Sequence, residues 1–106
     1  MNLTVNKRTR LLPAVENTKQ FQKDWDSCRR AGRYDMNKVA VAMTLVYSGN
    51  PIPADYLDHP LKGKDYQKGE RELHVGGDHL LIYRFNAERT LLTWIRFGTH
   101  SELFGR

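Results

Sequence analysis

The fold of this chain is decided by residues 71–97, which read RELHVGGDHLLIYRFNAERTLLTWIRF. The β-prone runs 71–75, 79–85 and 90–97 alternate with turn-forming segments, Gly-Gly-Asp and Asn-Ala-Glu-Arg. In the first run Leu73 faces one way and His74 the other, because successive side chains of a strand alternate. The stretch therefore predicts an antiparallel meander, and Gly98 is expected to close its last strand.

Two amphipathic helices are predicted ahead of the meander. Each shows apolar residues at helical spacing and a terminal glycine: Phe21, Trp25 and Cys28, extended backwards by Ala14 and Thr18, precede Gly32, and Met36, Val39, Ala40, Met43, Val46 and Tyr47 precede Gly49. Asp35 is placed to cap the start of the second helix with its carboxylate. The short link between the helices favours an antiparallel helical hairpin.

A short first strand is expected at Arg10-Leu11-Leu12, where Pro13 would stop it. Together these elements predict an α+β fold in which an N-terminal helical hairpin packs on a small antiparallel sheet. The helices should cover one face of the sheet and leave the other open. Neither a repeat nor a linker interrupts the sequence, so we expect a single domain spanning residues 1–106.

The charge of the chain points toward polyanions. The 106 residues carry a formal net charge of +5. A basic surface attracts nucleic acid, although the same charge can simply keep a protein in solution. The single Cys28 cannot form an internal disulfide, and a small buried apolar role is expected for it. No signal peptide or membrane span is apparent, so we expect a cytoplasmic protein.

Histidines supply the candidate chemistry, and all of them follow Asp58: His59, His74, His79 and His100. Imidazole titrates near neutrality, so two imidazoles can serve as base and acid. Cleavage of an RNA backbone needs such a pair and a cation for the charge that gathers on the phosphorane, a role that suits Arg96. Each histidine taken alone also fits an ordinary surface or half-buried position.

The sequence contains no motif typical of metal, nucleotide or serine-nucleophile sites. The sequence lacks Cys-x-x-Cys and His-Glu-x-x-His spacing, a Walker loop, a GxGxxG fingerprint and a serine elbow. Histidine ligands on separate turns would have to converge without any local motif, so we expect no metal and no cofactor. Phe104 follows the last strand in a polar tail, where it can stack on a base or dock on the core.

Four ordered motifs carry a family likeness: Asp58-His59-Pro60-Leu61-Lys62-Gly63; Arg71-Glu72-Leu73-His74-Val75 with Asp78; Leu81-Ile82-Tyr83-Arg84; and Gly98-Thr99-His100-Ser101-Glu102-Leu103-Phe104-Gly105. They resemble the signature of YafQ-type toxins, within the RelE/ParE superfamily of bacterial toxin–antitoxin systems. The likeness extends over residues 8–105.

The resemblance implies a microbial RNase-like fold and a ribosome-dependent endoribonuclease that cuts messenger RNA in the decoding site. It implies that His100 is the leading proton-transfer residue and that His59 or His74 is the base or a phosphate anchor. Arg96 would stabilise the phosphorane, and Asp78 would orient a partner. The residues expected to contact the substrate are Phe104, His79 and Lys62. Two positions depart from the family pattern and bear on codon preference: His79 stands where the family often has Trp, and Phe97 follows Arg96 where the family reads Thr.

The implied partners are the ribosome with its messenger RNA and a cognate antitoxin. That antitoxin would be a ribbon-helix-helix protein like DinJ, which would supply the contact with operator DNA; no membrane partner is expected. Two other functions remain open at this point. A ParE-like gyrase poison needs no histidine cluster, so the histidines count against it, and a catalytically silent nucleic-acid-binding domain would bind phosphates without turnover.

Overall fold

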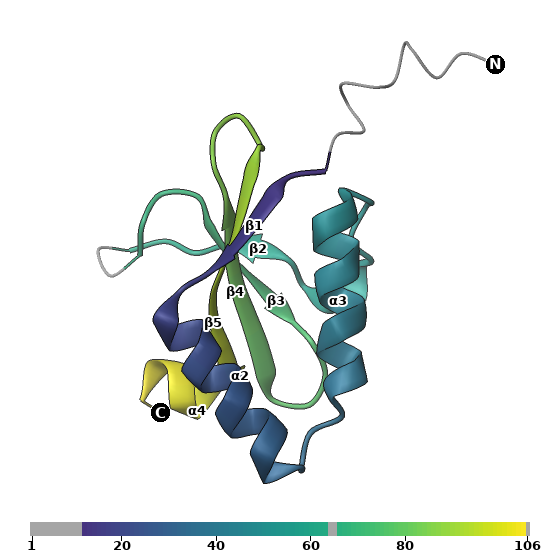
Figure 1. Ribbon diagram of the computed structural model, residues 1–106, viewed down its shortest axis with the longest axis vertical. Helices are drawn as coiled ribbons and strands as arrows, with labels where there is room; N and C mark the ends of the chain where they lie inside the picture. Colours follow the sequence, from purple (N-terminus) through teal and green to yellow (C-terminus); the bar gives the residue numbers. More distant parts are fainter. Residues whose placement is uncertain (1–11, 64–65, 106) are drawn as a thin grey trace, which may run out of the picture.

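A computed structural model describes residues 12–63 and 66–105 (Figure 1). Its elements in chain order are β1 (Ala14–Asn17), α2 (Lys19–Ala31), α3 (Met36–Ser48), a 3-10 turn η2 (Ala54–Tyr56), β2 (His59–Pro60), β3 (Glu70–His74), β4 (His79–Phe85), β5 (Leu91–Thr99) and α4 (His100–Phe104). The strands form one sheet in the order β1-β5-β4-β3-β2. No helix among these elements is long and apolar enough to cross a membrane.

The meander of β3, β4 and β5 is antiparallel, as predicted. Its register aligns Leu73, Leu81 and Phe97, and these side chains are buried in the core against Phe21 of α2 and Val39 of α3. The α+β prediction, with helices covering one face of the sheet, is therefore confirmed.

The opposite face of the sheet carries the aligned residues Glu72, Ile82 and Arg96, with His74 two residues further along β3. We call this side the open face. Ile82 lies buried as its apolar floor, whereas His74 and Arg96 are partly exposed. Alternation along β3 thus separates polar groups from the core, as the sequence indicated.

The first strand differs from the prediction. It spans Ala14–Asn17, after Pro13 instead of before it, and it pairs in parallel with β5, so the sheet is mixed. Leu12 lies outside any strand, and Arg10 and Leu11 fall outside the described residues. Proline lacks an N–H only at its own position. The next residue, Ala14, pairs with Leu91 of β5, and its amide donates to the carbonyl of Thr90, just before β5, at 2.9 Å.

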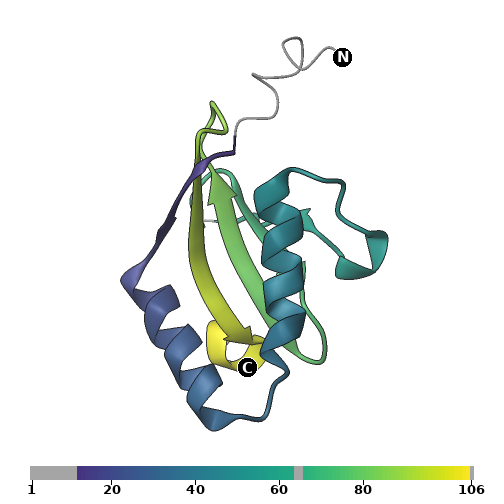
Figure 2. The ribbon, with the colours of Figure 1, turned by 45° about the vertical axis from the view of Figure 1, so that its right-hand side comes forward.

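The helix ends follow the predicted signals. Gly32 and Gly49 adopt the left-handed conformation that ends α2 and α3, and Asp35 caps α3 by accepting from Asn37 N at 3.0 Å. Thr18 is the cap of α2 and does not belong to its apolar stripe, since its hydroxyl accepts from Phe21 N at 2.9 Å. The helices diverge from their short link, and they pack on the sheet more than along each other (Figure 2).

The last strand also runs further than predicted. Gly98 does not close β5, which continues to Thr99 after a bulge at Ile95. Gly98 permits the close approach of α4, because a Cβ atom there would lie 3.0 Å from Glu102 Oε1. Thr99 and Glu102 form a capping box that starts α4 at His100. The strand end and its cap thereby fix where His100 leaves the sheet.

Candidate active site

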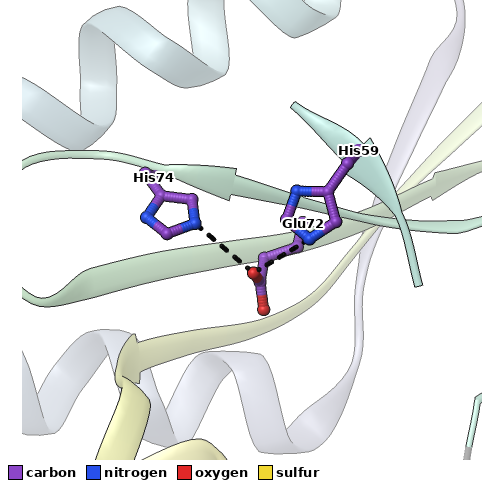
Figure 3. A group of neighbouring side chains, drawn as sticks. All are labelled: His59, Glu72 and His74. Atoms are coloured by element: carbon purple, nitrogen blue, oxygen red, sulfur yellow. Dashed lines mark ion pairs between the residues drawn. The ribbon is translucent and has the colours of Figure 1, made fainter. Parts of the chain in front are cut away.

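A buried carboxylate lies between two imidazoles on the open face (Figure 3). Glu72 Oε1 is 3.3 Å from His59 Nε2 and 3.5 Å from His74 Nε2, and the Glu72 side chain is only 9% exposed. The imidazole centroids are 6.1 Å apart. His59 reaches this position because β2 pairs it directly with Glu72, and His74 because it lies two residues beyond Glu72 on β3. We call His59, Glu72 and His74 the His–Glu cluster.

The ring of His59 is fixed by the backbone before it. Its Nδ1 lies 2.6 Å from the Leu57 carbonyl oxygen, which can only accept, so Nδ1 carries the proton and donates. The other nitrogen, Nε2, then faces Glu72. Leu57 has a positive φ of 53°, which is uncommon for a branched residue and turns its carbonyl toward the ring.

Asp58 anchors the segment that carries His59. Its carboxylate accepts from Arg71 Nε at 3.1 Å, Arg71 Nη2 at 3.3 Å and the Tyr83 hydroxyl at 2.7 Å. Burial and this hydrogen bond to Asp58 raise the pKa of Tyr83, so the phenol stays a donor at neutral pH. The short strand β2 is therefore tied to both β3 and β4 next to the His–Glu cluster.

His100 and Phe104 complete the site from α4. With Tyr66 and Glu72 they line a cavity of about 250 Å³, which puts His100 next to the His–Glu cluster. The His100 and Phe104 rings are 5.0 Å apart, and Phe104 meets Tyr66 edge-on at 6.2 Å. The His100 amide donates to the Asp78 carbonyl at 3.1 Å. Asp78 thus orients His100 through its main chain.

Arg96 borders the same region, but its guanidinium is already paired. The carboxylate of Asp24, on α2, accepts hydrogen bonds from Arg96 Nε at 2.8 Å and from Arg96 Nη2 at 3.1 Å. Burial disfavours ionisation of Asp24, but hydrogen bonds from Arg96, from Gln20 and from the Phe97 amide outweigh it and lower its pKa. Arg96 also lines a second hollow of about 490 Å³ beside Tyr66 and Phe104.

His79 does not join the other histidines. It lies on the helix-covered face, where its ring stacks on Tyr34 at 4.0 Å and its Nε2 is 3.7 Å from Cys28 Sγ. Burial lowers the pKa of His79 and raises that of the Cys28 thiol. Register explains the separation, because His79 aligns with Thr99 and alternates with Leu80. The structure therefore does not bring His79 to the side of the sheet that carries His59 and His74, and the expected contact of His79 with the substrate stays a prediction.

The remaining predicted residues sit at the margins. Lys62 is exposed, three residues beyond His59, and Asp78 is exposed in the turn between β3 and β4. Cys28 is only partly buried, but it packs against the core cluster, in line with the apolar role expected for it. Glu72 is the residue that the sequence reasoning missed. Glu72 is two residues before His74, so alternation along a strand alone predicts that the two share a face. The contact between Glu72 and His59 depends on the pairing of β2 with β3, which the sequence does not indicate.

The cluster has the groups that general acid–base chemistry requires. A carboxylate holds two imidazoles, a third imidazole lies across a small cavity, and an arginine and an aromatic ring border it. Such an arrangement can accept a proton, donate one and offset charge on a phosphate.

Comparison with known proteins gives consistent matches. A family described as "Bacterial toxin of type II toxin-antitoxin system, YafQ" matches residues 13–105. The mRNA interferase toxin YafQ of Escherichia coli strain K12 is 41% identical over 92 residues, covering 86% of this chain and 95% of that relative.

Solved structures match over nearly their whole length. A toxin chain from the crystal structure of the E. coli DinJ-YafQ toxin–antitoxin complex superposes with a TM-score of 0.79 at 40% identity, covering 90% of this chain and 100% of that one. A metal-bound toxin from Helicobacter pylori gives a TM-score of 0.76 at 33% identity, covering 89% of this chain and 100% of that one.

Proposed function

The chain belongs to the YafQ family of bacterial type II toxin–antitoxin toxins, as its motifs suggested, and on that premise we propose that it is an endoribonuclease that cleaves messenger RNA. The observation that carries the proposal is the convergence of His59, His74 and Glu72 on the open face beside His100. These groups come from β2, β3 and α4, so only the tertiary fold brings His59 and His100 to the pair formed by Glu72 and His74 on β3.

We assign the base to His59. Its Nδ1–H donates to the Leu57 carbonyl, which leaves Nε2 to take the proton of a ribose 2′-hydroxyl. Glu72 stabilises the imidazolium that forms, because its carboxylate already faces both His59 and His74. His74 then serves as a phosphate anchor in its protonated form.

We assign the acid to His100, which faces the same cavity from α4. The 2′-oxygen attacks the adjacent phosphorus, the bond from phosphorus to the 5′-oxygen breaks, and His100 protonates that oxygen. The products are a 2′,3′-cyclic phosphate and a free 5′-hydroxyl. Arg96, which Asp24 holds by Nε and Nη2, offers Nη1 to the phosphorane, and Phe104 stacks on a neighbouring base.

The partners follow from the family and from the site. The E. coli relative was crystallised with DinJ, and we propose that a DinJ-like antitoxin binds this chain and supplies any contact with operator DNA. The cavity is open and lined by only a few side chains, so we propose that the ribosome helps to position the substrate there. Action on messenger RNA in the decoding site implies a cytoplasmic location.

Cleavage on programmed ribosomes tests the proposal. Wild-type protein should generate new RNA ends that carry a cyclic phosphate and a 5′-hydroxyl, and free RNA should be a poor substrate. His100→Gln should lose cleavage, whereas His79→Gln, altered on the other face of the sheet, should retain it. Thermal unfolding of each variant controls for folding. Intact RNA with wild-type protein, or blocked gyrase supercoiling in its place, would refute the assignment.

A further inference from the structure

We propose that Asp24 of α2 is a positioning residue for RNA cleavage and that it acts through Arg96. The inference rests on the proposed nuclease function, because it assigns what holds the guanidinium that faces the phosphorane. Nothing local in the sequence indicates this role, since Asp24 lies 72 residues before Arg96. The two side chains meet only because α2 packs beside β5 (Figure 2).

The last part of β5 is bonded by side chains of α2 and its cap instead of by a strand. Within the described residues, β1 pairs with β5 only as far as Trp94, and no strand pairs with that edge beyond this point. The Thr18 hydroxyl donates to the Ile95 carbonyl at 2.7 Å, and Asp24 Oδ2 accepts from the Phe97 amide at 3.0 Å. The residue between these two backbone groups is therefore held from both sides by α2.

The Asp24 carboxylate is a fixed anion. Its Oδ2 accepts from Arg96 Nε and from the Phe97 amide, and its Oδ1 accepts from Arg96 Nη2 and, at 3.0 Å, from Gln20 Nε2. Burial opposes ionisation, but these hydrogen bonds outweigh it and lower the pKa of Asp24. The side chain is only 9% exposed, so water competes little for its oxygens. Arg96 thus contacts a charge that is fixed in position.

This contact uses one edge of the guanidinium and leaves another available. A carboxylate that binds Nε and Nη2 together fixes the plane of the guanidinium. Among the described residues no acceptor is bonded to Nη1 of Arg96, and the side chain is 31% exposed. Arg96 lines a hollow with Tyr66 and Phe104, and the same two rings line the cavity of His100. A phosphate between the two hollows would lie within reach of both Arg96 and His100.

Asp24 also offsets part of the positive charge of Arg96, which weakens the attraction of Arg96 for any phosphate. Orientation outweighs this loss during the reaction, because charge gathers on the phosphorane only in the transition state and a donor already in place needs no reorganisation. A displacement of about 1 Å can cost roughly 100-fold in rate. Loss of Asp24 should therefore slow the chemical step more than it weakens binding.

Single-turnover cleavage on programmed ribosomes tests this, with the rate at saturating toxin measured separately from the half-saturating concentration. Asp24→Asn turns an amide donor toward the guanidinium, so the saturating rate should fall about tenfold or more while the half-saturating concentration changes little. Asp24→Glu keeps the charge and should recover part of the rate. The matched control is Asp26→Asn on the same helix, which should cleave as wild type because Asp26 pairs only with Arg29, at 3.9 Å near the solvent.

A double-mutant cycle separates positioning from a general loss of stability. Arg96→Gln should slow cleavage, and adding Asp24→Asn to Arg96→Gln should slow it no further. A further loss in the double variant overturns the inference, because Asp24 would then act through folding. So does a wild-type or faster rate in Asp24→Asn, since Asp24 would then merely neutralise Arg96.

The failure of the broader proposal has a different signature. Wild-type protein that never cleaves refutes the nuclease function and this inference together. Arg96→Gln that cleaves at the wild-type rate refutes the role of Arg96, and with it that of Asp24, while the nuclease function stands.

Discussion

Replacing Glu72 by Gln should slow cleavage while leaving the fold intact. Gln keeps the size of the side chain and removes only the charge that lies 3.3 and 3.5 Å from the two imidazoles. A hydrogen bond to a charged group is worth about 1.5–3 kcal/mol against about 0.5–1.5 kcal/mol for a neutral one. Both rings are more than a third exposed, so solvent screening reduces the difference to about 1 kcal/mol for each contact.

Two such contacts amount to about 2 kcal/mol, which corresponds to a roughly 30-fold lower cleavage rate if both imidazoles act in the transition state. The assay is single-turnover cleavage on programmed ribosomes, followed across pH. A positioning role predicts a changed pH profile in Glu72→Gln and partial recovery in Glu72→Asp, which keeps the charge. A Glu72→Gln rate within threefold of wild type at every pH would refute the reasoning.

Further perturbations test the supports of the site. Asp58→Asn should lower the free energy of unfolding by about 1–3 kcal/mol, because Arg71 and the buried Tyr83 hydroxyl lose a charged acceptor; unchanged urea denaturation would contradict it. The pKa of Asp24 is lowered in the folded state, so its contribution to stability is present above the unfolded pKa and is lost as pH falls through the folded pKa. Asp24→Asn should therefore reduce the fall in the free energy of unfolding at acid pH. An unchanged dependence of that free energy on pH would argue against the ion pair with Arg96. The pKa of His79 is lowered by burial, so the unfolded chain binds more protons as pH falls through about 6.5 and stability should decline there. His79→Phe should remove that decline without loss of cleavage, and a persistent decline in thermal unfolding would show another group to be responsible.

Local signals predicted much of this fold correctly. Gly32, Gly49 and Asp35 end or start helices for reasons contained within a few residues, namely a left-handed conformation or a side-chain cap. His74 faces away from the core because strand side chains alternate, and this too is a local rule. Elements specified by neighbours in sequence were therefore predictable.

Elements specified by distant partners were not. The position of β1 depends on the free edge of β5, and Arg96 depends on Asp24, 72 residues away along the chain. Glu72 meets His59 only through the two-residue strand β2, which has too little periodicity to be recognised. His79 was assigned to the substrate by a family position, yet its strand register places it on the helix-covered face. Register and edge pairing, which no local window contains, thus decided the site.

The central claim is that imidazoles from separate elements act together at one ribose–phosphate junction. A double-mutant cycle tests it most directly, with His59→Gln, His100→Gln and the double variant compared in single-turnover cleavage on ribosomes. Groups that act as one unit give strongly non-additive losses. The account predicts that the double variant cleaves about as slowly as the slower single variant. Losses that multiply, or a single variant that keeps the wild-type rate, would contradict it.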